Sequence, residues 1–150
     1  MSRARNVADI IKQPFATTLG TSNYRAGVNA GDSIASGGNN NVIIGDEAGT
    51  ALTTGDQNVA IGANALKTVV THSDSVAVGY KALEVAVIGG NTAIGSEALL
   101  KTTSGANNVA VGTSAGQQVT TGTENVLIGQ GCGDALTDAE KKDEDEISKL

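Results

Sequence analysis

The residues that could do chemistry are few and stand apart from one another. His72 is the only histidine and Cys132 the only cysteine of the 150-residue chain, so one subunit cannot build a zinc site of the usual His and Cys type. His72 takes the place of a turn glycine in neighbouring repeats, which favours an exposed loop position. Cys132 stands where neighbouring repeats carry alanine, which favours a small buried slot over a reactive thiol. We therefore expect no enzyme, no catalytic residue, no metal site and no cofactor.

Two glycine-containing patterns fall short of known ligand loops. The segment 129–133, Gly-Gln-Gly-Cys-Gly, lacks the strand, helix and second acidic residue of a dinucleotide site. Gly-Asp pairs at 31–32, 45–46 and 55–56 lack the nonapeptide pattern that binds calcium in β-helices. Solvated turns account for both patterns.

The dominant pattern is a repeat whose closing glycines are evenly spaced. The pentad Asn-Val-Ala-Ile-Gly, or a close variant, recurs with its glycine at intervals of 17, 17, 16, 17 and 17 residues. A fixed short period indicates one small structural unit stacked on copies of itself. The six glycines are Gly45, Gly62, Gly79, Gly95, Gly112 and Gly129.

Each pentad predicts a short strand that is apolar on both faces. The two β-branched residues project from one face, and the residue between them projects from the other. That middle residue is also apolar in all six repeats, so both faces should be buried. One face can cover the inside of its own coil, but so short a coil has too little material to cover the other. We expect another copy of the same chain to cover it.

These observations predict an all-β fold, a parallel β-roll or β-helix solenoid of about six coils of 16–17 residues with short helical or irregular termini. Each coil should contain an inner strand, a glycine corner, a more polar outer strand and a Thr/Gly turn, with asparagines stacked along the axis. We expect the alanines between the β-branched residues to let the backbones of different copies approach closely. The predicted residues of the seam between copies and of the core are Val42, Ile44, Val59, Ala60, Ile61, Val76, Ala77, Val78, Ala93, Ile94, Val109, Ala110, Val111, Val126 and Ile128.

The chain divides into four parts by composition. Residues 1–22 form a non-repetitive leader, 23–38 a degenerate capping coil, 39–136 the repeats and 137–150 an acidic tail. The leader is a frayed terminus or an anchor into a partner surface, and the tail is a solvated partial helix or docks on a basic neighbour. The candidate anchor residues are Arg3, Arg5, Val7, Ile10 and Ile11.

Composition disfavours several classes of partner. Aromatic residues make up 2% of the chain, and no basic stripe is evident, so nucleic-acid and sugar binding are not expected. No apolar run approaches the length of a membrane span, and we expect no membrane association. The first residues are too polar for a secretory signal, so we expect synthesis in a cytoplasm without export.

The repeats resemble those of two groups of proteins. The pentads 58–62, 108–112 and 125–129 are similar to the head repeats of trimeric autotransporter adhesins. Similar repeats with Thr-Thr-Gly turns occur in bacteriophage fibre and tail-associated virion proteins. The resemblance covers residues 39–133 and implies a left-handed parallel β-roll that forms a homotrimer through its inner strands. The coils here are longer than is usual for adhesin heads, so the outer loop should differ.

The resemblance implies a structural function. We expect a component of a bacteriophage virion, a short trimeric fibre, spike or decoration protein, which assembles in the host cytoplasm. Its N-terminal segment would dock on other virion proteins of the capsid or tail. The alternative is an adhesin or receptor-binding module that recognises a host cell surface.

Overall fold

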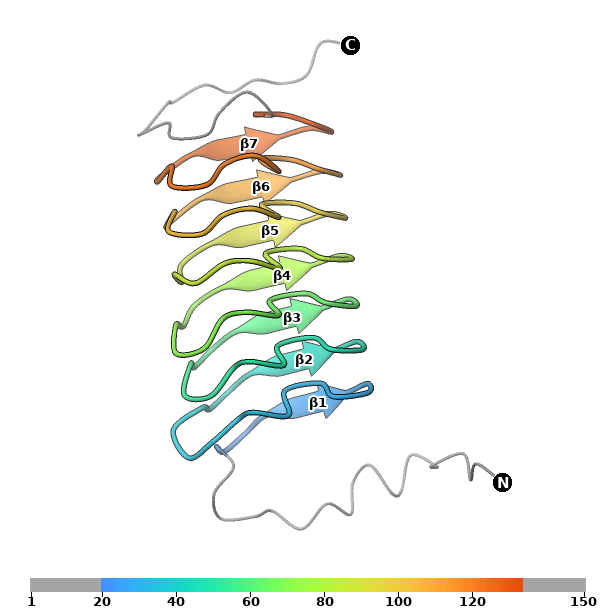
Figure 1. Ribbon diagram of the computed structural model, residues 1–150, viewed down its shortest axis with the longest axis vertical. Helices are drawn as coiled ribbons and strands as arrows, with labels where there is room; N and C mark the ends of the chain where they lie inside the picture. Colours follow the sequence, from blue (N-terminus) through green and yellow to red (C-terminus); the bar gives the residue numbers. More distant parts are fainter. Residues whose placement is uncertain (1–19, 134–150) are drawn as a thin grey trace, which may run out of the picture.

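The protein is a solenoid built on one parallel sheet of seven short strands (Figure 1). The structure, a computed structural model, describes residues 20–133. Strand order in the sheet is the order in the sequence, so each coil adds one strand next to the last. The expected all-β parallel solenoid of about six coils is confirmed, and residues 20–133 contain no helix. The strands are β1 Tyr24–Ala26, β2 Val42–Ile44, β3 Val59–Ile61, β4 Val76–Val78, β5 Thr92–Ile94, β6 Val109–Val111 and β7 Val126–Ile128.

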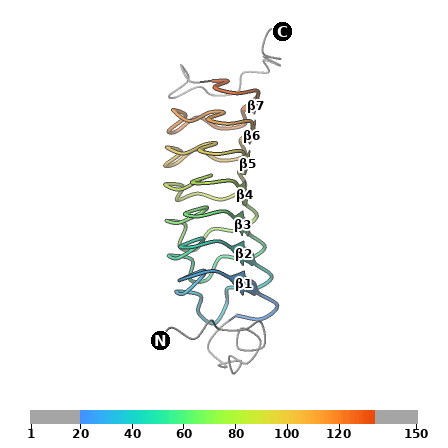
Figure 2. The ribbon, with the colours of Figure 1, turned by 90° about the vertical axis from the view of Figure 1, so that its right-hand side faces the viewer.

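The pairing register places equivalent residues of successive repeats beside one another. Val42 pairs with Val59, and the two following residues of β2 pair with their counterparts in β3. Parallel neighbours lie about 4.8 Å apart, so the six steps from β1 to β7 span roughly 30 Å. Figure 2 shows the strands in one column along the rod, with the connecting segments on the opposite side.

Within residues 20–133 the expected outer strand is absent, because the connecting segments fold into turns. Asn64 and Leu66 adopt φ values of 59° and 54°, and such left-handed residues cannot continue an extended strand. The coils still bond to one another here: the Asn64 N–H donates to the Asp46 carbonyl at 3.0 Å, and the Leu66 N–H donates to the Ala82 carbonyl at 3.0 Å. Hydrogen bonds between coils therefore continue beyond the sheet and around the coil.

The glycine that closes each pentad is required because its φ is positive and because the next coil leaves no room for a side chain. Gly62 has a φ of 132°, and a Cβ atom there would collide with the carbonyl oxygen of Gly79 in the next coil. The same relation holds between Gly45 and Gly62. A side chain at this corner would separate the coils, which explains why the period is marked by glycine.

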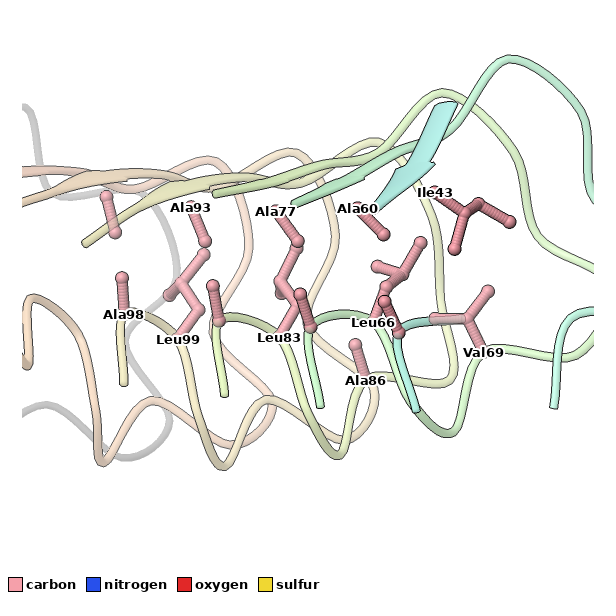
Figure 3. Packing of buried hydrophobic residues seen from close by; sticks show 14 of the residues in the cluster. Ile43, Ala60, Leu66, Val69, Ala77, Leu83, Ala86, Ala93, Ala98 and Leu99 are labelled. Carbon is pink, nitrogen blue, oxygen red and sulfur yellow. The ribbon is translucent and has the colours of Figure 1, made fainter. Parts of the chain in front are cut away.

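The core lies inside each coil, between the strand and the connecting segment. The middle residue of the strand points inward and meets the fourth residue after the glycine. In Figure 3, Leu83 lies beneath Ala77 and Leu99 beneath Ala93, and all four are fully buried. Leucine in a left-handed conformation costs about 1–2 kcal/mol, and burial of its side chain offsets that cost by about 1.5–3 kcal/mol.

Most coils carry one large and one small residue at these two core positions. Where the strand carries Ile43, the fourth residue after the glycine is Gly49, and a Cβ at Gly49 would lie 3.2 Å from the Ile43 Cδ1. The coil of Ala110 and Gly116 is filled from its neighbours: a Cβ at Gly116 would lie 2.7 Å from Leu127 Cδ1 and 2.8 Å from Leu99 Cδ2. In each coil these two positions together thus have room for about one large side chain.

The expected stack of asparagines is confirmed as a hydrogen-bonded ladder. The Asn41 Oδ1 accepts bonds from the Asn58 backbone N–H at 2.9 Å and from its Nδ2 at 3.1 Å, while the Asn41 Nδ2 donates to the Gly55 carbonyl at 2.9 Å. The pattern recurs from Asn91 to Asn108 and on to Asn125. The ladder is interrupted at Ser75, the one serine among the repeat asparagines.

Residues 23–38 form a coil in register with the rest, and its corner is Gly27. Gly27 has a φ of 135°, and a Cβ there would meet the Gly45 carbonyl. Gly31 is the fourth residue after this glycine and is equivalent to Gly49. Because Gly27 and Gly45 are 18 residues apart, the first coil is one residue longer than most others. The predicted leader up to residue 19 and the acidic tail 137–150 lie outside the described residues.

The alternation of core volumes predicts a compensating double substitution. Ile43→Ala should lower the free energy of unfolding by about 2–5 kcal/mol, because it leaves a cavity beside Gly49. Gly49→Leu alone should also destabilise, because the added side chain meets Ile43. The double variant recreates the pair found at Ala60 and Leu66, and urea unfolding should show a favourable coupling of about 1–3 kcal/mol. If the losses in free energy of unfolding were strictly additive in the double variant, the two positions would not share one large side chain as proposed.

Candidate self-association face

The first and third residues of the strands form an apolar band on the outside of the sheet, which we call the outer strip. In β2 to β7 these side chains are half-buried or exposed, with Ile94 at 41%, Val126 at 42% and Ile128 at 52% exposure. Eleven of the twelve are Val or Ile, so the strip is continuous. Its members are Val42, Ile44, Val59, Ile61, Val76, Val78, Thr92, Ile94, Val109, Val111, Val126 and Ile128.

The outer strip follows from strand geometry. Alternate residues of a strand point to opposite faces, and the inward face is filled by the middle residue. Parallel sheets are found almost always with both faces covered. Here one face is covered by the chain's own connecting segments, and the outer strip is not covered by any of the described residues.

The expected role of the alanines in the seam between copies is corrected by the structure. Ala60, Ala77, Ala93 and Ala110 are fully buried inside their own coils. Their small size makes room for a leucine within the same chain, as Leu83 does beneath Ala77. The alanines are therefore core residues, and the β-branched residues of the predicted set form the exposed face.

The predicted set of seam residues omits three members of this region. Thr92 occupies a valine position of the outer strip, and its hydroxyl is the strip's single polar group in β2 to β7. Tyr24 and Ala26 extend the strip onto β1, where Tyr24 is 60% exposed. The spacing from Gly27 to Gly45 was the signal that could have identified them. Arg25, between them, takes the middle position and donates from its Nη1 to the Gly31 carbonyl at 2.7 Å.

Apart from Arg25 at the middle of β1, the charged groups of residues 20–133 lie in the connecting segments rather than on the strip. The Lys67 Nζ lies 2.6 Å from a carboxylate oxygen of Glu47, and this hydrogen bond raises the pKa of Lys67. Lys81 contacts Glu84 at 3.4 Å and lies over the Tyr80 ring at 5.5 Å from its centroid. Both pairs are solvent-accessible and contribute little to stability. The outer strip of β2 to β7 is electrically neutral.

The residues considered for chemistry are scattered. His72 is exposed, and its carbonyl accepts a bond from the Asn58 Nδ2 at 3.0 Å, as expected for a turn residue. Cys132 is buried, as expected. Among residues 20–133 no group of three or more His, Cys, Asp or Glu could hold a metal ion, and no helix could cross a membrane. The candidate anchor residues Arg3, Arg5, Val7, Ile10 and Ile11 lie outside the described part of the chain.

Comparison with protein-family models, with curated proteins and with solved structures gives no match.

The inward and outward positions predict opposite outcomes for the same substitution at adjacent residues. Ala93→Arg places a charge inside a filled coil and should prevent folding. Ile94→Arg places the charge on the outer strip and should leave the β-sheet circular-dichroism signal of the coil in place. Equal loss of structure in both variants would contradict the assignment of faces.

Proposed function

We propose that this chain is a structural, non-catalytic rod that associates with copies of itself through the outer strip. The observation that carries the proposal is the continuous, neutral band of Val and Ile on a parallel sheet face. Bands of this kind on a soluble protein mark interaction sites. The described residues bring together no nucleophile, base and orienting group that could support a catalytic alternative.

An identical copy is the partner that fits this band best. The side chains of the strip repeat at the strand spacing over the whole sheet. A partner must therefore present apolar ridges with the same spacing over the same length, and a second copy does so by construction. The absence of charge on β2 to β7 means that like copies meet without repulsion.

The dimensions of the strip favour three copies over two. A band roughly 30 Å long and about 10 Å wide has a footprint on the order of 300 Å². Stable interfaces bury about 800 Å² on each partner. In a closed threefold arrangement each copy contacts two others along its whole length, so the flanks of the coil add to the buried surface. The resemblance to trimeric adhesin heads supports the same number.

The proposed biological setting is a bacteriophage virion, in which the trimer is a short fibre, spike or decoration. Repeats similar to these occur in phage fibre and tail-associated proteins, and a rod held by hydrogen bonds between coils suits a mechanical role. The segment 1–22 would attach the trimer to a capsid or tail protein.

A receptor-binding role is the second candidate, and one observation favours it. Val70, Val85 and Val87 are 43%, 38% and 44% exposed in the connecting segments, away from the outer strip. In a trimer closed through the strip they would remain accessible to a host surface.

The association is tested by placing a charge on the strip. Wild-type protein should sediment as a trimer at micromolar concentration. Ile94→Arg should weaken association by at least about 100-fold, because a buried unpaired charge costs about 3–5 kcal/mol. Ser104→Arg, at an exposed position of the connecting segment, should leave the trimer unchanged. Wild-type protein that sediments as a monomer at micromolar concentration would overturn the proposal.

The virion assignment is tested by mass spectrometry of purified particles from cells that produce this chain. Peptides from residues 20–133 should be present in intact virions at a copy number divisible by three. Removal of residues 1–14 should abolish incorporation while the trimer persists. Virions without these peptides would remove the virion role. Competition of soluble trimer for cell attachment would favour the receptor-binding role.

A further inference from the structure

The interruption of the asparagine ladder leaves polar groups without partners inside the solenoid. Ser75 is 1% exposed, and its Oγ has no hydrogen-bond partner. Asn91, at the equivalent position of the next coil, is fully buried. Its backbone N–H has no partner among residues 20–133. The equivalent N–H of Asn108 is bound to the Asn91 Oδ1 at 3.0 Å.

The other ladder steps show which groups should meet here. An asparagine at position 75 would use its Oδ1 to accept from both nitrogens of Asn91. Its Nδ2 would donate to the carbonyl three residues before Asn91, which is that of Ile88, as the Asn41 Nδ2 does to Gly55. With serine at 75, the Asn91 Nδ2 turns to the Ile88 carbonyl instead, at 3.0 Å.

The Asn58 Oδ1, one coil before Ser75, accepts fewer hydrogen bonds than its counterparts at other steps of the ladder. The Asn58 Oδ1 accepts from the Ser75 backbone N–H at 3.1 Å, whereas the Asn41 Oδ1 accepts two bonds from Asn58. A donor N–H, a hydroxyl and partly used acceptors therefore surround the place that an amide fills at other steps. Serine is two heavy atoms shorter than asparagine, close to the size of one water molecule.

From this arrangement we infer that the ladder step between Ser75 and Asn91 is a binding site for one buried water molecule. The water accepts a hydrogen bond from the Asn91 N–H and donates to the Ser75 Oγ, with the Ile88 carbonyl as its second acceptor. Buried waters in proteins typically make about three such bonds to groups that lack other partners. A donor N–H and the absence of a charged side chain at this step disfavour a cation.

The site gives the short coil a specific role in the stack. The interval from Gly79 to Gly95 is the single 16-residue interval, and it is the coil that runs from Ser75 to Asn91. The water completes the ladder across this coil, so two uninterrupted asparagine runs are joined through a solvent molecule rather than through an amide.

The test is water–amide cross-relaxation by NMR on the full-length protein. The Asn91 amide should show a cross-peak with a long-lived water, whereas the Asn108 amide, bound to an asparagine oxygen, should show none. Ser75→Asn should abolish the Asn91 cross-peak, because the amide takes the place of the water. It should also slow Asn91 hydrogen exchange about 5- to 10-fold, the effect of one added hydrogen bond.

Absence of a long-lived water at Asn91 in the wild-type protein overturns the inference without any variant. A cross-peak that persists unchanged in folded Ser75→Asn overturns the assigned position. If Ser75→Asn does not fold, Ser75→Ala serves instead: loss of the hydroxyl should weaken the Asn91 cross-peak, and an unchanged one contradicts the role of Ser75.

Discussion

The structure depends on the hydrogen bonding of each coil to the coils on either side of it. A coil of about 17 residues is too small to bury a core of its own, so its stability comes from its neighbours. Backbone bonds between coils occur in the sheet and also in the connecting segments, as between Asn64 and Asp46. The glycine corner and the asparagine ladder both serve this contact, one by allowing close approach and the other by satisfying buried polar groups.

The core shows how a narrow solenoid is filled without aromatic side chains. At the pair of positions made by the middle strand residue and the fourth residue after the glycine, each coil accommodates about one large aliphatic residue. It lies on the strand, as Ile43 does, or on the connecting segment, as Leu83 does. Where both positions are small, as at Ala110 and Gly116, neighbouring layers supply Leu99 and Leu127. Neighbouring coils thus fill one another's core. A large side chain can therefore move from one core position to the other, but a change in the total volume of the core side chains should lower stability.

The two faces of the sheet have different roles: the inward face stabilises the single chain, and the outward face is the proposed association surface. The inward side chains complete the solenoid within one chain, and the outward ones remain as a neutral apolar strip. Apart from Arg25 in β1, the charged residues of the described part of the chain lie in the connecting segments, where ion pairs such as Lys67 with Glu47 are exposed. This division supports the proposed trimeric rod, because the surface that would be hidden between copies carries no charge on β2 to β7.

The sequence by itself determined the architecture, because a period of 16–17 residues with glycine at a fixed place allows little other than a stacked parallel coil. It also predicted the asparagine ladder, since identical polar residues at one level must meet. Which strand face lies inside was decided by the tertiary structure. Alternation alone leaves Ala77 and its flanking valines equivalent, and the choice depends on Leu83, which fills the coil from the opposite wall. The turns were likewise missed, because left-handed residues such as Leu66 are held by burial and by contacts with the next coil rather than by local preference.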